Sequence, residues 1–295
     1  FDESLLLKLK VQSLHLQEHA IWYKSYSEIE MTPLDMYNPL DAHQDHLSQQ
    51  HCYDGTGTLA WLASKALAWA FDQDVHGIFS KYIMSQENQK RREKTLILEL
   101  GCGTGLSGLA TLLLTTPDAA SKLNVKVVFT DSDMESLDNC RDNCELNGIP
   151  SDRYAHERLS WGMPDTYPSN CLGAVDVVLA ADVLYDVKMI APLLQTAYTL
   201  LRPHSLSGNL AIDQSDGPNF ASEGGYLILS HVPRFCLSRE DHEHDDHNDP
   251  SDTDHSSTRT KQPFQLLEEH IIHLALSCGF VLITMFRPHM VLLQY

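Results

Sequence analysis

The chain has 295 residues, a formal net charge of −19 and 43% apolar residues, which is typical of an acidic globular protein with one large or two small domains. This charge argues against nonspecific binding to the phosphates of nucleic acids. Its apolar runs fall short of the about 18 residues that a membrane-spanning helix needs, so we expect no such helix.

The N-terminus and the cysteines indicate the cellular compartment in which we expect the protein. The chain begins with Phe1 and has no basic leader with a cleavage site, so we expect no signal peptide and interpret the missing Met as a sign of a trimmed or partial chain. Its 7 cysteines are an odd number, spread through apolar segments. This pattern favours reduced thiols in a cytosolic or nuclear protein over a disulfide framework.

The N-terminal part of the chain is expected to differ from the rest. Alternating apolar residues predict a strand within residues 7–17, and residues 1–50 as a whole are expected to be a partly irregular extension. Residues 58–71 have apolar side chains nearly all round a helix, which indicates a buried helix. We expect residues 51–295 to form one domain.

Strand-like and helical segments then alternate along the chain. Strands are predicted at 95–100, 125–133, 153–159, 174–186, 224–235, 281–286 and 290–295, and helices from a glycine turn to about 114 and at 134–148, 188–203 and 264–280. This alternation indicates an α/β fold, a Rossmann-like, mostly parallel, twisted sheet of seven strands with helices on both faces. Only residues 287–289 join the last two strands, so the last strand must be antiparallel, because a parallel crossover needs about a dozen residues or more.

An acidic, histidine-rich run precedes the last predicted helix. Residues 239–255 hold eight carboxylates against Arg239. Four histidines in this run (His242, His244, His247 and His255) permit a metal site, but a stretch without apolar anchors is more typical of a solvated loop. We therefore expect a disordered insertion at about 239–262 and no metal site there.

A glycine turn follows the strand at 95–100, in the sequence E-L-G-C-G-T-G. It lacks the Gly-Lys-Ser/Thr of a phosphate-binding loop, and Gly101 and Gly103 are followed by Leu106 where a dinucleotide fingerprint has a third glycine. Glu99 lies two residues before Gly101, a position that suits a ligand with an ammonium or sulfonium group. Alternatively, Glu99 is only a strand-end residue and the glycines form a tight turn.

This turn resembles the S-adenosylmethionine loop of the seven-β-strand methyltransferases. The resemblance implies that Gly101 and Gly103 let the backbone approach the cofactor and that Glu99 faces its amino-acid end. Asp131 follows the second strand, where such folds place an acid that binds both ribose hydroxyls, while Asp133 is better suited to cap the next helix. After the third strand, Trp161 is expected to cover the adenine, with Leu159 or Ser160 alongside, or else to be a half-buried surface side chain.

The fourth strand ends in Asp182-Val-Leu-Tyr185. This D-x-x-Y resembles a motif of a protein-lysine methyltransferase family, in which it borders the point where cofactor and substrate lysine meet. The resemblance implies that Asp182 orients the amine, that Tyr185 forms part of an apolar wall and that Ala181 borders the cofactor. The alternative roles are a cap for Asp182 and a core aromatic for Tyr185.

The segment "GTGTLAWLASKALAWA" (55–70) also resembles that family, with Trp61 matching its Trp before the first helix. The most similar branch is that of the elongation-factor-2 lysine methyltransferases, although Leu62 stands where they carry Glu. We therefore predict an S-adenosylmethionine-dependent protein-lysine methyltransferase of the cytoplasm or nucleus, with a translation factor as one candidate substrate. A small-molecule amine methyltransferase and a non-catalytic cofactor-binding relative are the alternatives.

One arginine and one pair of cysteines are further candidates for a functional role. Arg234, after the fifth strand, is expected either to contact substrate or to form a surface ion pair. Cys140 and Cys144 share one helix face, but without a second pair of ligands in the sequence we interpret them as buried thiols and expect no metal. We also expect no nucleic-acid or membrane partner.

Overall fold

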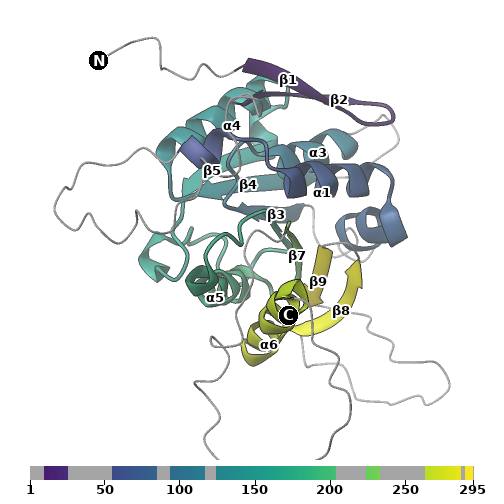
Figure 1. Ribbon diagram of the computed structural model, residues 1–295. Helices are drawn as coiled ribbons and strands as arrows, with labels where there is room; N and C mark the ends of the chain where they lie inside the picture. The colour runs from purple at the N-terminus through teal and green to yellow at the C-terminus, as the bar shows by residue number, and fades with distance from the viewer. Residues whose placement is uncertain are drawn as a thin grey trace, which may run out of the picture.

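A computed structural model describes residues 10–25, 55–84, 94–116, 124–203, 224–232, 263–286 and 290–294 (Figure 1). Arg234 and the acidic run at 239–262 lie outside the described residues, so the predictions for them stay predictions. Within the described part of the chain, no helix is both long and apolar enough to cross a membrane.

The described residues form a seven-stranded sheet with the order β5-β4-β3-β6-β7-β9-β8. Its strands are β3 Thr95–Leu100, β4 Val125–Asp131, β5 Tyr154–Arg158, β6 Val177–Ala181, β7 Tyr226–Ser230, β8 Val281–Phe286 and β9 Met290–Gln294. Neighbours from β5 to β7 are parallel, and β9 is antiparallel to both β7 and β8. The predicted α/β class and the antiparallel last strand are confirmed, and the structure adds that β9 lies between β7 and β8.

Helices cover both faces of the sheet, as predicted (Figure 1). On one face lie α1 Leu62–Asp72, α3 Leu106–Leu114 and α4 Met134–Leu146, and on the other lie α5 Ile190–Leu200 and α6 Pro263–Ser277. Each face has its own buried apolar cluster, which includes Leu67 and Leu109 on the first and Leu194 and Leu267 on the second. The central strand β6 is buried along its whole length, because helices cover it on both sides.

Several elements end earlier than predicted, each for a local reason. β4 ends at Asp131 because Asp133 is the N-cap of α4, its carboxylate accepting hydrogen bonds from the backbone N–H groups of Glu135 and Ser136. β6 ends at Ala181 because Asp182 has a positive φ of 62°. α5 ends at Leu200 because Leu201 is extended and bridges to Val175 beside the sheet.

An N-terminal hairpin packs on this domain. β1 Lys10–His15 and β2 Ala20–Ser25 pair in antiparallel fashion, and the sequence predicted only the first of them. Ile21 and Tyr23 of β2 are buried, at 0% and 2% exposure. Lys24 binds α4 through its Nζ, 2.7 Å from Asp142, and its backbone N–H, 2.7 Å from Oδ1 of Asn143. Polar side chains on α4 therefore hold part of the predicted extension against the domain.

Candidate active site

The glycine turn lies where β3 ends, at the edge of the sheet where β4 and β6 also end. Gly101 and Gly103 have φ values of 63° and 50°, in the left-handed region that favours glycine. A Cβ on Gly101 would lie 2.8 Å from Cγ1 of Val183 and 3.0 Å from Cζ2 of Trp161, and a Cβ on Gly103 would lie 2.8 Å from the carbonyl oxygen of Gly57. Both positions therefore require glycine, because their backbone is left-handed and protein atoms already fill the space that a Cβ would take.

Asp131, the last residue of β4, lies directly beside this turn. Its Oδ2 accepts a hydrogen bond from the N–H of Gly103 at 3.0 Å, and its Oδ1 accepts one from the N–H of Asp133 at 3.1 Å. Burial raises the pKa of the Asp131 carboxyl, although these two hydrogen bonds oppose the shift. A carboxylate has about four acceptor sites, so these two bonds do not use all of them, and the contact of Asp131 with a ribose stays a prediction. The separate role predicted for Asp133, a helix cap, is confirmed.

Glu99 is a buried residue near the end of β3. Its side chain is 2% exposed, and its Oε2 accepts a hydrogen bond from the N–H of Gly108 at 3.0 Å, in the first turn of α3. Burial raises the pKa of this carboxyl to about 8. The carboxyl group therefore caps α3 in this structure, and its contact with the amino-acid end of a cofactor stays a prediction.

Trp161 lies after β5, and its ring borders Gly101. It is partly exposed and packs on the apolar cluster beneath α5, while Leu159 is buried and donates its N–H to the carbonyl of Asp131 at 2.9 Å. Trp161 thus forms one side of the turn, which is compatible with the predicted cover over an adenine. Ser160 is held by the side chain of Thr166, to whose Oγ1 it donates its N–H at 3.0 Å.

Asp182 follows Ala181, the 9% exposed last residue of β6, and joins three elements. Its φ of 62° is unusual for a residue other than glycine. Its Oδ2 accepts a hydrogen bond from the N–H of Ala63 at 3.1 Å, in the first turn of α1, and its own N–H donates to the carbonyl of Ser230 at 2.7 Å. A strained backbone held by its surroundings is common at functional sites.

The remaining predicted residues flank Asp182. Trp61 immediately precedes α1, and its carbonyl accepts a hydrogen bond from the hydroxyl of Ser64 at 2.7 Å. Tyr185 is 47% exposed, so its ring lies at the surface and not in the core. The core alternative for Tyr185 is therefore wrong, while its role in a wall against substrate stays a prediction.

The structure also adds residues that the sequence did not single out. The hydroxyl of Ser230 donates to the carbonyl of Ala63 at 3.1 Å, so Ser230 and Asp182 together hold the start of α1. Val183 and Gly57 limit the space at Gly101 and Gly103. The sequence did not single out Ser230 because the predicted strand continued to residue 235. In the structure β7 ends at Ser230, and ligands of such sheets bind at the ends of the parallel strands.

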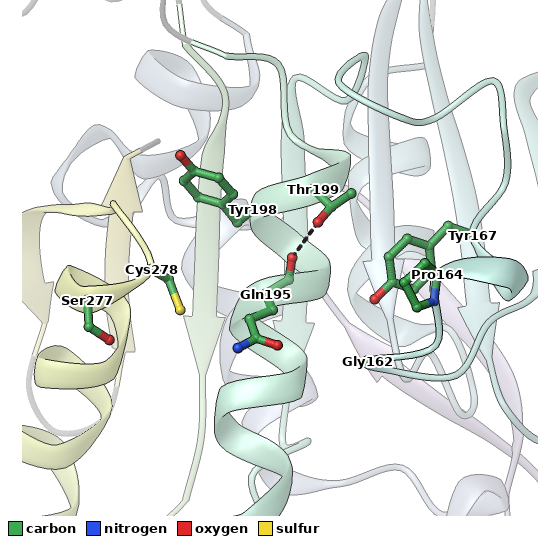
Figure 2. A pocket seen from close by; sticks show the side chains of 8 residues that line it. All are labelled: Gly162, Pro164, Tyr167, Gln195, Tyr198, Thr199, Ser277 and Cys278. Atoms are coloured by element: carbon green, nitrogen blue, oxygen red, sulfur yellow. Dashed lines mark hydrogen bonds between the residues drawn. The ribbon is translucent and has the colours of Figure 1, made fainter.

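A separate pocket of about 380 Å³ lies elsewhere, between α5, α6 and the segment after Trp161 (Figure 2). It is lined by Gly162, Pro164, Tyr167, Gln195, Tyr198, Thr199, Ser277 and Cys278. None of the predicted site residues lines it. We therefore assign the candidate site from the strand ends and not from this pocket.

Comparison with known proteins identifies the class. A family described as lysine methyltransferase matches residues 42–211, and the chain belongs to this family. The chain is 33% identical over 130 residues to the ribosomal protein L11 methyltransferase of Pseudomonas putida, which covers 42% of this chain and 37% of that protein. It is 30% identical over 152 residues to the human protein-lysine N-methyltransferase EEF2KMT, covering 48% of this chain and 39% of that protein. A solved structure, the CurJ carbon methyltransferase, aligns with a TM-score of 0.45 at 15% identity over 78% of this chain and 57% of that chain.

Membership confirms the family that the sequence resembles, a family of methyltransferases whose methyl donor is the predicted cofactor, S-adenosylmethionine. The chain spans less than two-fifths of the length of the two curated relatives named here. Their activities therefore enter for this chain as proposals.

Proposed function

We propose that this protein transfers a methyl group from S-adenosylmethionine to the side-chain amine of a lysine in a protein. The observation that carries this proposal is the meeting of three features at one edge of the sheet. These are the left-handed glycine turn, the Asp131 carboxylate that is hydrogen-bonded to it, and the strained Asp182 whose neighbour Val183 borders Gly101.

The residues fit the cofactor. Gly101 and Gly103 are partly exposed, so the backbone of the turn is accessible to a ligand. Asp131 is fixed by two backbone N–H donors beside the turn, and Trp161 also lies beside the turn, where an adenine ring can stack. When bound, S-adenosylmethionine supplies an electrophilic methyl group on a sulfonium.

The protein's own contribution is position and dehydration. The lysine nitrogen must arrive as a neutral amine, and its reference pKa is about 10.4, so the site must favour loss of a proton to solvent. A neutral amine would then attack the methyl carbon with its lone pair, and the electrons of the C–S bond would stay on sulfur. Asp182 orients the amine through a hydrogen bond, and Tyr185 limits access of water. Fixing two reactants in line can contribute about 7–11 kcal/mol to lowering the barrier.

A protein substrate is supported by the family and by the printed name of the human relative, which is a protein-lysine N-methyltransferase. We propose a translation factor as the first substrate to test, and the cytoplasm or nucleus as the compartment. The free thiols at Cys102, Cys140, Cys144, Cys171 and Cys278 support a reducing compartment.

The test uses S-adenosylmethionine with a labelled methyl group and an extract of cells that lack this protein. Wild type is compared with Asp182→Asn, since Asn tolerates a positive φ and keeps the side-chain volume. Asp165→Asn, the same change at an exposed residue of the short 3-10 helix Pro164–Thr166, is the matched control. We expect a labelled protein band with wild type and the control, and a loss of about 100-fold with Asp182→Asn.

The other outcomes separate the alternatives. Label that appears only in the small-molecule fraction would favour an amine of low molecular weight as the substrate. Cofactor binding without any transfer, to the extract or to purified translation factors, would favour a non-catalytic relative. Equal transfer by wild type and Asp182→Asn would remove Asp182 from the site.

A further inference from the structure

A cluster of soft ligands lies beside the glycine turn and uses none of the residues assigned to the site above. Cys140 and Cys144 are one turn apart on α4, and His156 lies on the neighbouring strand β5. The potential ligand atoms of these three residues all lie within 4.8 Å of one another. Cys140 and Cys144 are fully buried, as the sequence predicted, but His156 comes beside them only through the fold. The sequence places no second ligand pair near the two cysteines, so this cluster could not be predicted from spacing.

A third sulfur reaches the cluster from the turn itself. Cys102 lies between Gly101 and Gly103, is 6% exposed, and its thiol contacts the thiol of Cys140. A Cβ on Gly105 would lie 2.3 Å from Sγ of Cys140, so the sulfur occupies the space beside the start of α3. The thiol of Cys102 therefore lies next to Cys140, at the edge of the group formed by Cys140, Cys144 and His156.

The imidazole of His156 is poised as a ligand. Its ring stacks on Phe129 at a centroid distance of 5.3 Å, which fixes its orientation. Its Nε2 is buried and has no hydrogen-bond partner among the described residues. A neutral imidazole has a lone pair on one ring nitrogen, and this is the form that binds metal ions. A buried polar atom without a partner calls for an explanation, and an ion is one of the few available.

We propose that Cys102, Cys140, Cys144 and His156 bind a zinc ion. Thiolate and imidazole are the donors that zinc prefers in closed structural sites, and two ligands at i and i+4 on one helix face are a common part of such sites. In a tetrahedral zinc site the ligand atoms are roughly 3.4–3.8 Å apart, as follows from Zn–S and Zn–N bonds of about 2.3 and 2.0 Å. The three atoms that lie within 4.8 Å need to approach by about 1 Å.

Binding releases protons and links three elements. Burial raises the pKa of the Cys102 thiol to about 12 and raises that of Cys140 as well, so without an ion these thiols are neutral. Zinc takes the place of three S–H protons, which leave to solvent, and forms three Zn–S bonds and one Zn–N bond. The ion would join α4 and β5 to the glycine turn. The zinc proposal does not depend on the proposed methyl transfer, because the zinc ligands are not the residues assigned to that reaction.

The test is the metal content of the purified full chain in the presence of a reductant. Atomic emission spectroscopy should find about one zinc per chain. Reconstitution with Co²⁺ should give the absorption bands of a cobalt ion with tetrahedral thiolate ligands. His156→Gln and Cys144→Ser should each lower zinc affinity by about 10-fold or more, since even changes to residues behind the ligands have effects of this size.

The control is Cys171→Ser, which makes the same change at a fully buried cysteine in the cluster on the other face of the sheet. It should keep the zinc. A wild-type protein that is folded by circular dichroism but binds neither zinc nor cobalt would overturn the proposal. So would full zinc affinity in His156→Gln, a partly exposed position where folding is expected to survive. Full affinity in Cys102→Ser would remove Cys102 from the ligand set.

Discussion

Asp182 accepts a hydrogen bond from the backbone N–H of Ala63 at 3.1 Å, so the carboxylate that follows β6 caps the first turn of α1. This bond joins two segments that the sequence assigned to one family on separate grounds, the stretch around Trp61 and the D-x-x-Y motif. The hydroxyl of Ser230 also donates a hydrogen bond to the carbonyl of Ala63. The position of α1 over the candidate site thus depends on a residue that we also place at the chemistry.

Asp182→Ala should therefore be less stable than Asp182→Asn. Loss of a helix cap costs about 1 kcal/mol, and a left-handed backbone without a polar side chain costs about 1–2 kcal/mol more. Asn keeps an acceptor oxygen and tolerates the positive φ, so it should lose only part of the cap. Urea unfolding of the two variants and wild type measures this, and equal free energies of unfolding for both variants would contradict it.

Gly103→Ala should weaken cofactor binding as well as folding. Its Cβ would lie 2.8 Å from the carbonyl of Gly57, at a φ of 50°. Gly148→Ala is the matched control, because Gly148 has a similar φ of 65° but nothing within 4 Å of the added Cβ. The control should lose about 1 kcal/mol of stability and bind S-adenosylhomocysteine like wild type.

For Gly103→Ala we expect a larger loss of stability than in the control and about a 10-fold or greater rise in Kd, which corresponds to about 1.4 kcal/mol. Titration calorimetry with S-adenosylhomocysteine measures both proteins. If the control loses as much affinity as Gly103→Ala, the cause is backbone strain in general and not the turn.

Glu99 should make stability depend on pH. Its pKa is raised from 4.5 to about 8 in the folded chain, so the folded state binds the proton more tightly than the unfolded state. The resulting stabilisation is fully present below pH 4.5 and is lost as the pH rises towards about 8. The slope that one such group contributes is at most about 1.4 kcal/mol per pH unit.

Glu99→Gln should remove this contribution, since the amide oxygen can still accept from Gly108 but does not titrate. The free energy of unfolding of wild type, measured between pH 4.5 and about 8, should fall more steeply than that of Glu99→Gln. Parallel curves for the two proteins would show that the pKa of Glu99 is not raised.

The parts of the fold that the sequence predicted well are those set by short-range spacing. The bounds of β3 and the end of α3 match the prediction, because an apolar run followed by a glycine turn defines both. Asp133 was identified as a cap for the same reason. The antiparallel β9 followed from the shortness of its connection, but its place between β7 and β8 depends on the whole sheet.

The sequence could not predict contacts between residues that are far apart in the chain. β2 was missed because polar groups of α4, such as Asn143, bind its backbone from far along the chain. The carboxyl of Glu99 binds the N–H of Gly108 in the first turn of α3. A carboxylate at this position suits either a helix N-terminus or the positive group of a cofactor, and no local sequence pattern decides between the two. His156 reached Cys140 and Cys144 only through the pairing of β5 with β4.

Tyr185 offers a test that separates substrate contact from folding. Because its side chain is 47% exposed, Tyr185→Ala should change the free energy of unfolding by less than about 1 kcal/mol. If its ring forms the wall that limits water around the amine, kcat/KM for the protein substrate should fall by about 10-fold or more. Leu172→Ala, at 49% exposure before β6 and thus at the opposite end of that strand, is the control and should keep wild-type kcat/KM. A Tyr185→Ala protein with unchanged kcat/KM would show that the exposed ring has no part in substrate binding, while a loss shared with Leu172→Ala would point to general destabilisation.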